Sequence, residues 1–226
     1  MARPLGLHGA WRVLSVGRIV RSLPLLVALV VAIGLGSSLA RADGLSAAEV
    51  DRLSCGETVV RAQAIQRANR HYVGGVAYVL LDDSAADLAR LLDDIDVWRR
   101  IVPKTRAAHR VMARGGDAGD ARIEITKGTA LVQATYTMRV RRDGSVIRFW
   151  MDRSRRHDIE DAWGFVRAEP TATGRTLVTY GVLIDMGPGI VRDLFEERVR
   201  TLALTVPDRL RGLVLERDAA GRRAWK

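Results

Sequence analysis

The residue types that most often hold metal ions lie closest together in one short stretch of the chain. This stretch contains His157, Asp158, Glu160 and Asp161. Alternate residues of a strand point to opposite faces, so His157 and Asp161 would point one way and the other two acids the other way. A metal site needs ligands that converge on one point. We therefore expect solvated carboxylates after a turn, and neither a metal ion nor a bound cofactor.

Nucleophilic catalysis finds little support in the sequence. The Gly-x-Ser-x-Gly motif of serine hydrolases is absent, and the single cysteine, Cys55, has no histidine near it in sequence. His71 and His109 are isolated among other residue types. One cysteine also excludes an internal disulfide. Residues 187–189 (Gly-Pro-Gly) precede a helical pattern but lack the lysine of a phosphate-binding loop.

The charge pattern argues against nucleic-acid binding. The 226 residues carry a formal net charge of +10, and half of this excess lies in the first 42 residues, which hold five arginines and no acid. Acids dilute the basic runs at 139–142 and 153–156, and only 5 Trp, 4 Tyr and 3 Phe are available for base stacking. We therefore expect no nucleic-acid partner. An ordinary solvated surface, or transient contact of a basic rim with anionic lipid headgroups, agrees better with the composition.

Several apolar patterns of period two contain side chains with polar or adaptable tips. Tyr136 and Met138 share one face of a segment, Phe149 and Met151 share a face of the next, and Tyr180 lies on the apolar face of a third. Tyrosine provides a hydrogen bond inside an apolar wall and methionine adapts its shape, as a cavity for a hydrophobic ligand requires. Plain core packing explains the same pattern equally well.

The N-terminal residues have the order of a secretory signal. A basic stretch, an apolar core over residues 23–35 and an Ala-Arg-Ala sequence at 40–42 follow one another. This order predicts cleavage after Ala42 and a periplasmic or secreted protein. The alternative is an uncleaved membrane anchor over residues 22–40, because a span needs about 20 uncharged residues.

The first elements after this signal are a short helix, then a strand followed by two short helices. Two of the helices start with a serine and an acid three positions later, the spacing of a capping box. Pro103 ends the last helix, and the polar residues 57–72 give no clear pattern. In order, the expected elements are a helix over 46–54, a strand over 73–82, a helix from Ser84 and a helix over about 94–102.

After Pro103 the apolar period changes to two. Turn-forming residues at 115–119, 143–144 and 170–174 separate four or five strand segments, of which Asp-Gly at 143–144 is the strongest hairpin signal. Each segment has one apolar and one polar face. This pattern predicts an antiparallel meander that is covered on one side only.

The predicted cover is the longest helical pattern in the chain, residues 189–216. Its apolar residues recur every three or four positions and form one stripe that includes Phe195 and Leu202. Pro207 must kink or interrupt this helix, because it cannot donate a hydrogen bond to the carbonyl of Ala203. We expect the stripe to pack on the sheet and to form one wall of any cavity there.

This order of elements resembles the START-like, or helix-grip, superfamily, which includes polyketide cyclase/dehydrase-type and coenzyme Q-binding proteins. The resemblance covers residues 74–217 and rests on GGVAYVLLDDSAADLARLLDDIDVWRRIVP, DIEDAWGFVRAEPTATGRTLVTYGVLID and PGIVRDLFEERVRTLALTVPDRLRGLV. It implies an α+β fold in which a curved antiparallel sheet wraps around a long C-terminal helix, with two short helices after the first strand and an apolar cavity between sheet and helix. The expected divisions are a signal peptide (1–42), an N-terminal extension (43–72), the START-like domain (73–217) and a basic tail (218–226).

The resemblance makes a hydrophobic small molecule or lipid the expected partner, which the domain would carry or sequester. Two alternatives remain open: an enzyme of the polyketide cyclase type, in which Tyr136, Tyr180 or Arg148 assists proton transfer, and a helper protein that acts through its surface. The ligand and the oligomeric state are left open. The expected cavity residues are Tyr136, Met138, Phe149, Met151, Tyr180, Val182, Phe195 and Leu202, with Trp98, Val102 and Pro103 at the cavity entrance.

Overall fold

The computed structural model describes residues 44–112, 120–128 and 133–224, so the predicted signal and the predicted turn at 115–119 lie outside the described residues. The strands are β1 (Val59–Arg67), β2 (Arg70–Leu81), β3 (Thr105–Arg110), β4 (Ala121–Gly128), β5 (Gln133–Asp143), β6 (Val146–Met151), β7 (Asp161–Pro170) and β8 (Thr176–Asp185). The helices are α3 (Ala47–Ser54), α4 (Ala85–Leu92), α5 (Ile95–Ile101), α6 (Ile190–Ala203) and α7 (Val206–Ala224).

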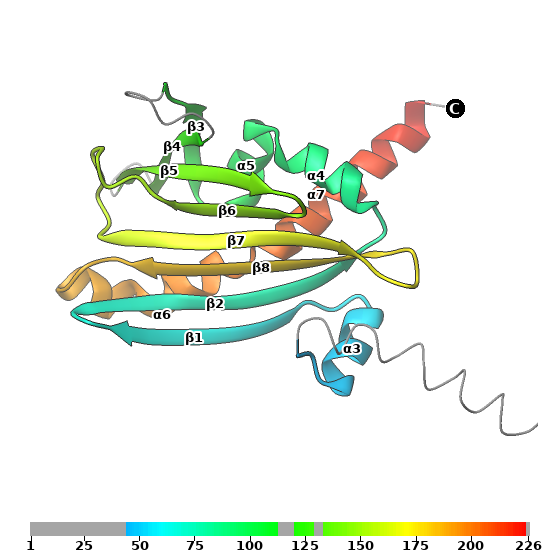
Figure 1. The fold of residues 1–226 in the computed structure, drawn as a ribbon, viewed down its shortest axis with the longest axis horizontal. Coiled ribbons are helices and arrows are strands. Elements are labelled where there is room, and N and C mark those ends of the chain that lie inside the picture. Colours follow the sequence, from blue (N-terminus) through cyan, green and yellow to red (C-terminus); the bar gives the residue numbers. More distant parts are fainter. Residues whose placement is uncertain (1–43, 113–119, 129–132, 225–226) are drawn as a thin grey trace, which may run out of the picture. The chain divides into compact units, whose positions relative to one another are not determined.

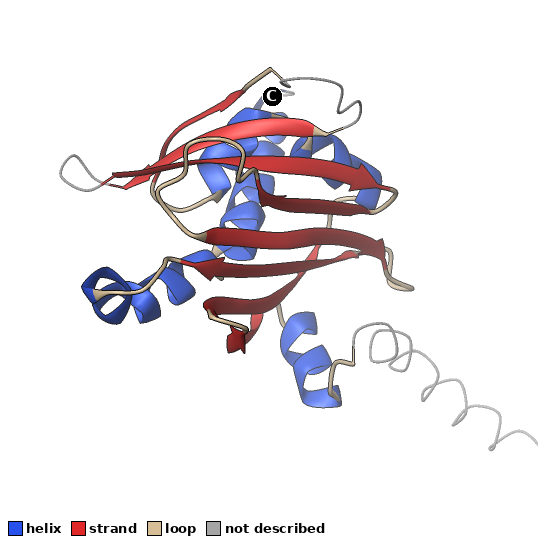
Figure 2. Ribbon diagram, turned by 60° about the vertical axis from the view of Figure 1, so that its left-hand side comes forward, coloured by secondary structure: helices blue, strands red, loops and turns tan. Residues whose placement is uncertain are grey.

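All described strands belong to one curved antiparallel sheet, which does not close into a barrel (Figures 1 and 2). Its order is β1-β2-β8-β7-β6-β5-β4-β3, so the last strand, β8, lies between β2 and β7. The predicted Asp-Gly hairpin joins β5 to β6, where Asp143 pairs with Val146 and Gly144 has a φ of 59°. Six described strands follow Pro103 rather than four or five, because β3 (TRAAHR) has almost no apolar residues to reveal it.

Serine caps start the first two helices, as their sequences predict. Ser46 accepts a hydrogen bond from the backbone N–H of Glu49 at 3.3 Å, and the Glu49 carboxylate accepts one from the backbone N–H of Ser46, which completes a capping box. Ser84 accepts a hydrogen bond from the N–H of Asp87 at 3.1 Å. These caps fix the residues at which α3 and α4 begin.

The N-terminal extension takes part in the sheet, which differs from the expected division. β1 pairs with β2 along its whole length, from Val59 opposite Tyr78 to Arg67 opposite Arg70. Leu53 of α3 is buried against the outer face of these strands. The meander was expected to be covered on one side only, but at this edge α3 covers its second face.

The C-terminal pattern forms two helices, because the chain leaves helical geometry at residues 204–205. Pro207 lies in the first turn of α7, where a backbone N–H would have no acceptor within the helix, so a proline is tolerated there. The break changes the phase of the apolar stripe: Leu210 of α7 is 2% exposed, whereas Phe195 of α6 is 43% exposed. The prediction of one continuous packed stripe was therefore wrong. α7 also continues to Ala224, through most of the predicted tail.

The main core lies between the inner face of the sheet and helices α4, α5 and α7, which Figure 1 shows behind the strands. Its fully buried members include Leu88 of α4, Ile101 of α5 and Leu210 of α7. They pack with inward-facing residues of β2 and β8 such as Val79 and Val178. This core anchors the helices at one end of the sheet, and a cavity remains next to it.

Candidate functional site

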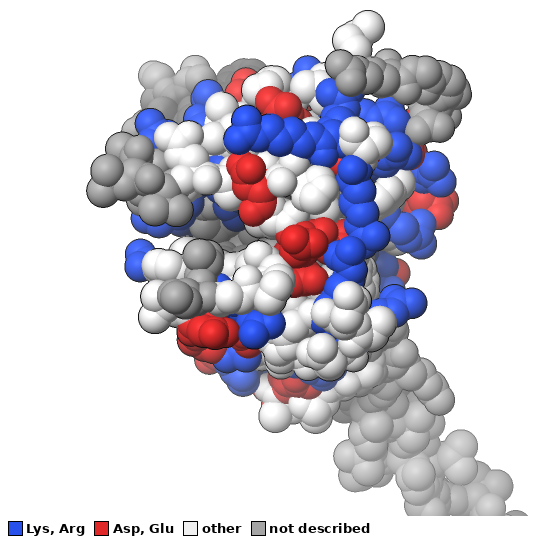
Figure 3. Space-filling view, turned by 90° about the vertical axis from the view of Figure 1, so that its left-hand side faces the viewer, with Lys and Arg blue, Asp and Glu red and all other residues white. Residues whose placement is uncertain are grey.

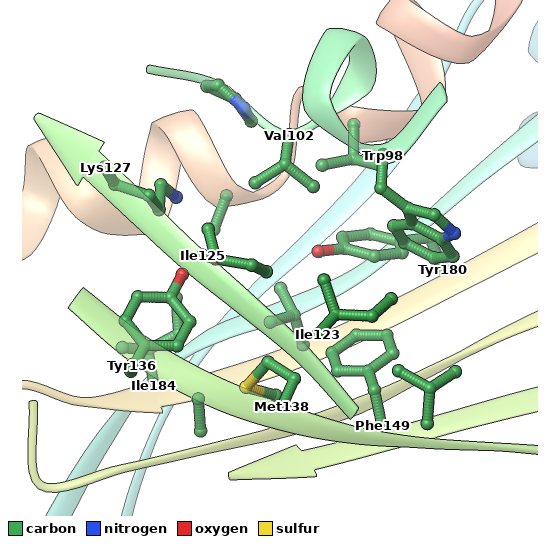
Figure 4. A pocket seen from close by; sticks show the side chains of 16 residues that line it. Trp98, Val102, Ile123, Ile125, Lys127, Tyr136, Met138, Phe149, Tyr180 and Ile184 are labelled. Carbon is green, nitrogen blue, oxygen red and sulfur yellow. The ribbon is translucent and has the colours of Figure 1, made fainter. Parts of the chain in front are cut away.

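A cavity of about 70 Å³ lies between the inner face of the sheet and the helices (Figure 4). Strands β4 to β8 form its floor, α5 with the loop after it forms one wall, and the junction of α6 and α7 contributes Ala203 and Val206. Apolar and aromatic side chains make up nearly all of the lining. A water molecule occupies about 30 Å³ of liquid, and typical ligand pockets measure about 300–1,000 Å³, so this cavity is narrow.

Most of the cavity residues expected from the sequence do line it. They come from three strands and from α5 with its following loop, as period-two and helical spacing require. These residues are Trp98, Val102, Pro103, Tyr136, Met138, Phe149, Tyr180 and Val182. Whether they bind a ligand stays a prediction.

Three of the expected residues do not line the cavity. Met151 is on the inner face but packs in a buried cluster with Met138 and Ala162. Phe195 is largely exposed on α6, and Leu202 is half-buried there, because the break before α7 turns the α6 stripe off the cavity wall. Arg148 points outward and pairs with Asp143 at 2.7 Å, so it cannot assist chemistry in the cavity.

The sequence reasoning missed β4, which contributes three lining residues. Ile123, Ile125 and Lys127 alternate along this strand and all face the cavity. The same alternation is visible in the sequence ARIEITKG, so a period-two count would have found them. It would also have placed a lysine on an apolar face. The other lining residues that were not expected are Val140, Ala162, Ile184, Ala203 and Val206.

Three aromatic rings form one end of the cavity, which we call the aromatic end: Trp98, Phe149 and Tyr180. The Trp98 and Phe149 rings meet edge to face with centroids 6.3 Å apart, and the Phe149 and Tyr180 rings stack at 6.2 Å. A Cβ atom at Gly164 would lie 2.5 Å from the Phe149 ring, so this glycine makes room for the ring. The Trp98 indole N–H already donates to the Leu92 carbonyl at 2.7 Å, which leaves only its apolar face for a ligand.

Lys127 and Tyr136 form the opposite end, the lysine end (Figure 4). Within the described part of the chain, the Lys127 ammonium and the hydroxyls of Tyr136 and Tyr180 make no hydrogen bond. Burial raises the pKa of both tyrosines above its ordinary value, so both hydroxyls stay protonated and can donate. Burial, together with the nearby charge of Arg209, lowers the pKa of Lys127 to about 8.

On the outer face of the same strands, two buried carboxylates have hydrogen-bond partners. Asp152 accepts hydrogen bonds from Arg122 at 2.9 Å and from Ser154 at 2.6 Å. Burial alone would raise the pKa of Asp152, but these bonds outweigh it and hold that pKa well below the usual range. Asp161 accepts a hydrogen bond from the Tyr72 hydroxyl at 2.7 Å.

A wider hollow of about 440 Å³ lies beside this outer network. It is lined by Trp150 and Trp163 and by the paired charges of Arg139, Asp152 and Asp161. It is open to solvent, and its acids already have basic partners. The hollow therefore resembles a surface depression more than an enclosed binding site.

The residues considered for a metal site do not gather in the structure. His157 contacts the Ile159 carbonyl at 2.8 Å, Asp158 accepts a hydrogen bond from the backbone of Thr135, and Asp161 belongs to the outer network. Among the described residues no group of three histidine, cysteine or acidic side chains could hold a metal ion. On the face shown in Figure 3, basic and acidic side chains are interspersed. None of the described helices is long and apolar enough to span a membrane.

Solved structures similar to this chain share its fold. The STAR-related lipid transfer protein of Xanthomonas axonopodis is 16% identical, with a TM-score of 0.54 over 70% of this chain and 93% of its own. The ZhuI aromatase/cyclase of a Streptomyces species is 15% identical, with a TM-score of 0.51 over 70% and 96%. A protein of Thermus thermophilus is 16% identical, with a TM-score of 0.50 over 62% and 96%.

These likenesses show that the described domain has the START-like, helix-grip fold, as the sequence indicated. At these identities they show the fold alone. No protein-family model and no curated protein sequence matches the chain. The function has to be argued from the cavity itself.

Proposed function

We propose that this protein is an exported START-like domain that binds a hydrophobic molecule in the cavity between its sheet and its C-terminal helices, as a carrier or a sequestering protein. The observation that carries the proposal is the cavity lining. Its walls are apolar and aromatic, and the few polar tips that reach it have no partner in the described protein. If this region were only part of the hydrophobic core, side chains would fill the space, or the polar groups would have hydrogen-bond partners within the protein.

The small volume implies that the cavity expands when it is occupied. Two irregular segments border it: the loop that follows α5, with Val102 and Pro103, and the break between α6 and α7, next to Ala203 and Val206. Neither segment has the continuous backbone hydrogen bonding that joins the strands on the opposite side of the cavity. Movement there would enlarge the cavity without breaking the sheet.

The name of one structural neighbour, a lipid transfer protein, agrees with this proposal, whereas the other is an aromatase/cyclase. The second name keeps an enzyme of the polyketide cyclase type as the alternative. Tyr136 and Tyr180 are the candidate proton donors of such an enzyme, because Arg148 faces away.

Native mass spectrometry of protein purified by gentle extraction tests the proposal. A bound hydrophobic molecule that leaves on denaturation is the expected result. Turnover of a polyketide-like chain would favour the enzyme. A protein that carries no ligand and takes up none from an extract of membrane lipids would contradict the carrier. If it also turned over no polyketide-like chain, a role of the surface would remain.

Export and membrane contact are separate parts of the proposal. Sequencing the N-terminus of exported protein should give Asp43 as the first residue, and a sequence that starts at Met1 would favour the anchor. Flotation with vesicles of anionic phospholipid tests transient contact with a membrane surface. Binding that salt weakens is expected if the basic side chains mediate it.

A further inference from the structure

The cavity contains a cation that has no counter-charge among the described residues. Lys127 is largely buried at the end of β4, and none of the described residues that line the cavity is acidic. A buried ammonium without an anionic partner is costly, and the lowered pKa of Lys127 reflects that cost. The charge of Arg209 on α7 acts on the same place and adds to the positive potential.

The neighbouring hydroxyl has the matching geometry for an oxygen ligand. The Tyr136 hydroxyl points toward the same space as the Lys127 ammonium (Figure 4). The two groups together supply several hydrogen-bond donors, and neither has an acceptor among the described residues. The aromatic end offers ring faces, and its one polar tip is the Tyr180 hydroxyl.

We propose that the ligand is a hydrophobic carboxylic acid, whose carboxylate is bound by Lys127 and Tyr136 while its apolar body extends toward the aromatic end. This inference rests on the proposed function and adds the chemical class of the ligand. A carboxylate supplies the missing counter-charge and accepts from both donors. An alcohol or a hydrocarbon of the same length brings no negative charge, so it leaves the buried ammonium without a counter-charge.

Calorimetric titration of the purified full chain with decanoate and with decan-1-ol at pH 7 tests the inference. We expect decanoate to bind at least about tenfold more tightly, because a hydrogen bond to a charged group is the main difference between the two ligands. Lys127→Met should weaken decanoate binding by about 10- to 100-fold and leave decan-1-ol binding within about threefold. Arg90→Met, at an exposed basic residue of α4 that does not line the cavity, is the control for loss of a positive charge and should change the affinity for neither ligand.

A pH series on the unmodified protein gives a second test that needs no variant. Decanoate binding requires a protonated Lys127, so it should be about tenfold weaker at pH 9 than at pH 7, whereas decan-1-ol binding should not change. The two tyrosines at the cavity, Tyr136 and Tyr180, keep their protonation over that range because burial raises their pKa. The other charged group that acts on this lysine is Arg209. Titration with 2-naphthoate shows whether an aromatic acid binds more tightly than an acyl acid, with the same dependence on Lys127.

The outcomes separate this inference from the proposed function. Equal affinities for decanoate and decan-1-ol, or a preference for decanoate that survives Lys127→Met, would overturn the inference and leave hydrophobic binding standing. If the unmodified protein bound neither ligand nor any lipid from an extract, the proposed function would fail with it.

Discussion

Buried charged groups lie on both faces of strands β4 to β8, but the carboxylates on the outer face have partners that the lysine on the inner face lacks among the described residues. On the outer face Asp152 contacts Arg122 and Ser154, and Asp161 contacts Tyr72. On the inner face the tips of Lys127, Tyr136 and Tyr180 point into a cavity, without a partner among the described residues. Paired polar groups on the outer face hold the strands together, whereas unpaired ones on the inner face are available to a ligand.

The largest effect is expected on the outer face, from Asp152→Asn. The side chains of Asp152 and Arg122 are 2% and 3% exposed, so the variant removes a buried negative charge that lies 2.9 Å from a buried guanidinium. We expect a loss of about 3–5 kcal/mol in the free energy of unfolding, measured with urea. Asp143→Asn is the matched control, because Asp143 forms an exposed pair with Arg148, and it should cost less than about 1 kcal/mol.

The same carboxylate should make the protein sensitive to acid. The pKa of Asp152 is lowered in the folded state, so its contribution is complete above the unfolded pKa of about 4 and is lost as the pH falls further. The unmodified protein should therefore lose stability below about pH 4 more steeply than Asp152→Asn. Parallel curves for the two proteins would show that the outer network does not stabilise the fold.

A change of opposite sign is expected on the inner face, from Lys127→Met. Removal of an unpaired buried ammonium should stabilise the ligand-free protein by about 1–2 kcal/mol at pH 7. The folded pKa, about 8, lies below the unfolded value of 10.5, so the penalty is complete below about pH 8 and disappears as the pH rises toward 10.5. The free energy of unfolding of the unmodified protein should therefore approach that of the variant between about pH 8 and 10.5. A destabilised variant at pH 7 would mean that Lys127 has a structural partner.

The smallest effects come from a pair of tyrosines, one on each face. Tyr72→Phe removes the donor to Asp161 and should cost about 1–2 kcal/mol in urea unfolding. Tyr136→Phe removes a hydroxyl that has no partner among the described residues, and should change stability by less than about 0.5 kcal/mol. The same variant should weaken binding of the hydrophobic acid. Equal losses of stability for both tyrosines would remove the distinction between the two faces.

Local signals in the sequence determined most of the elements. Ser46 and Ser84 marked helix starts because an N-cap depends only on residues within one turn. The Asp-Gly hairpin at 143–144 and the alternation in β5 and β8 gave strands with the correct inner faces. Most of the cavity residues followed from that alternation, since period two decides the face of every residue in a strand.

The sequence predictions were wrong where contacts between distant parts of the chain determine the structure. The apolar residues of β1 do not alternate regularly with polar ones, and most of the strand is exposed, so its place depends on backbone pairing with β2, which no local pattern reveals. Phe195 has the correct helical spacing, but the break at 204–205 separates its helix from the one that packs on the sheet. Spacing reports which residues share a face and does not report which face meets the core.

The sequence by itself thus determined the fold class and the strand faces, because capping, turn formation and periodicity act over a few residues. Only the tertiary structure decided which polar groups are paired. Arg122 and Lys127 lie five residues apart on one strand, yet one meets Asp152 and the other meets an apolar cavity. Partners come from strands and helices distant in sequence, and a buried charge is stabilised or left unpaired only when those elements close around it.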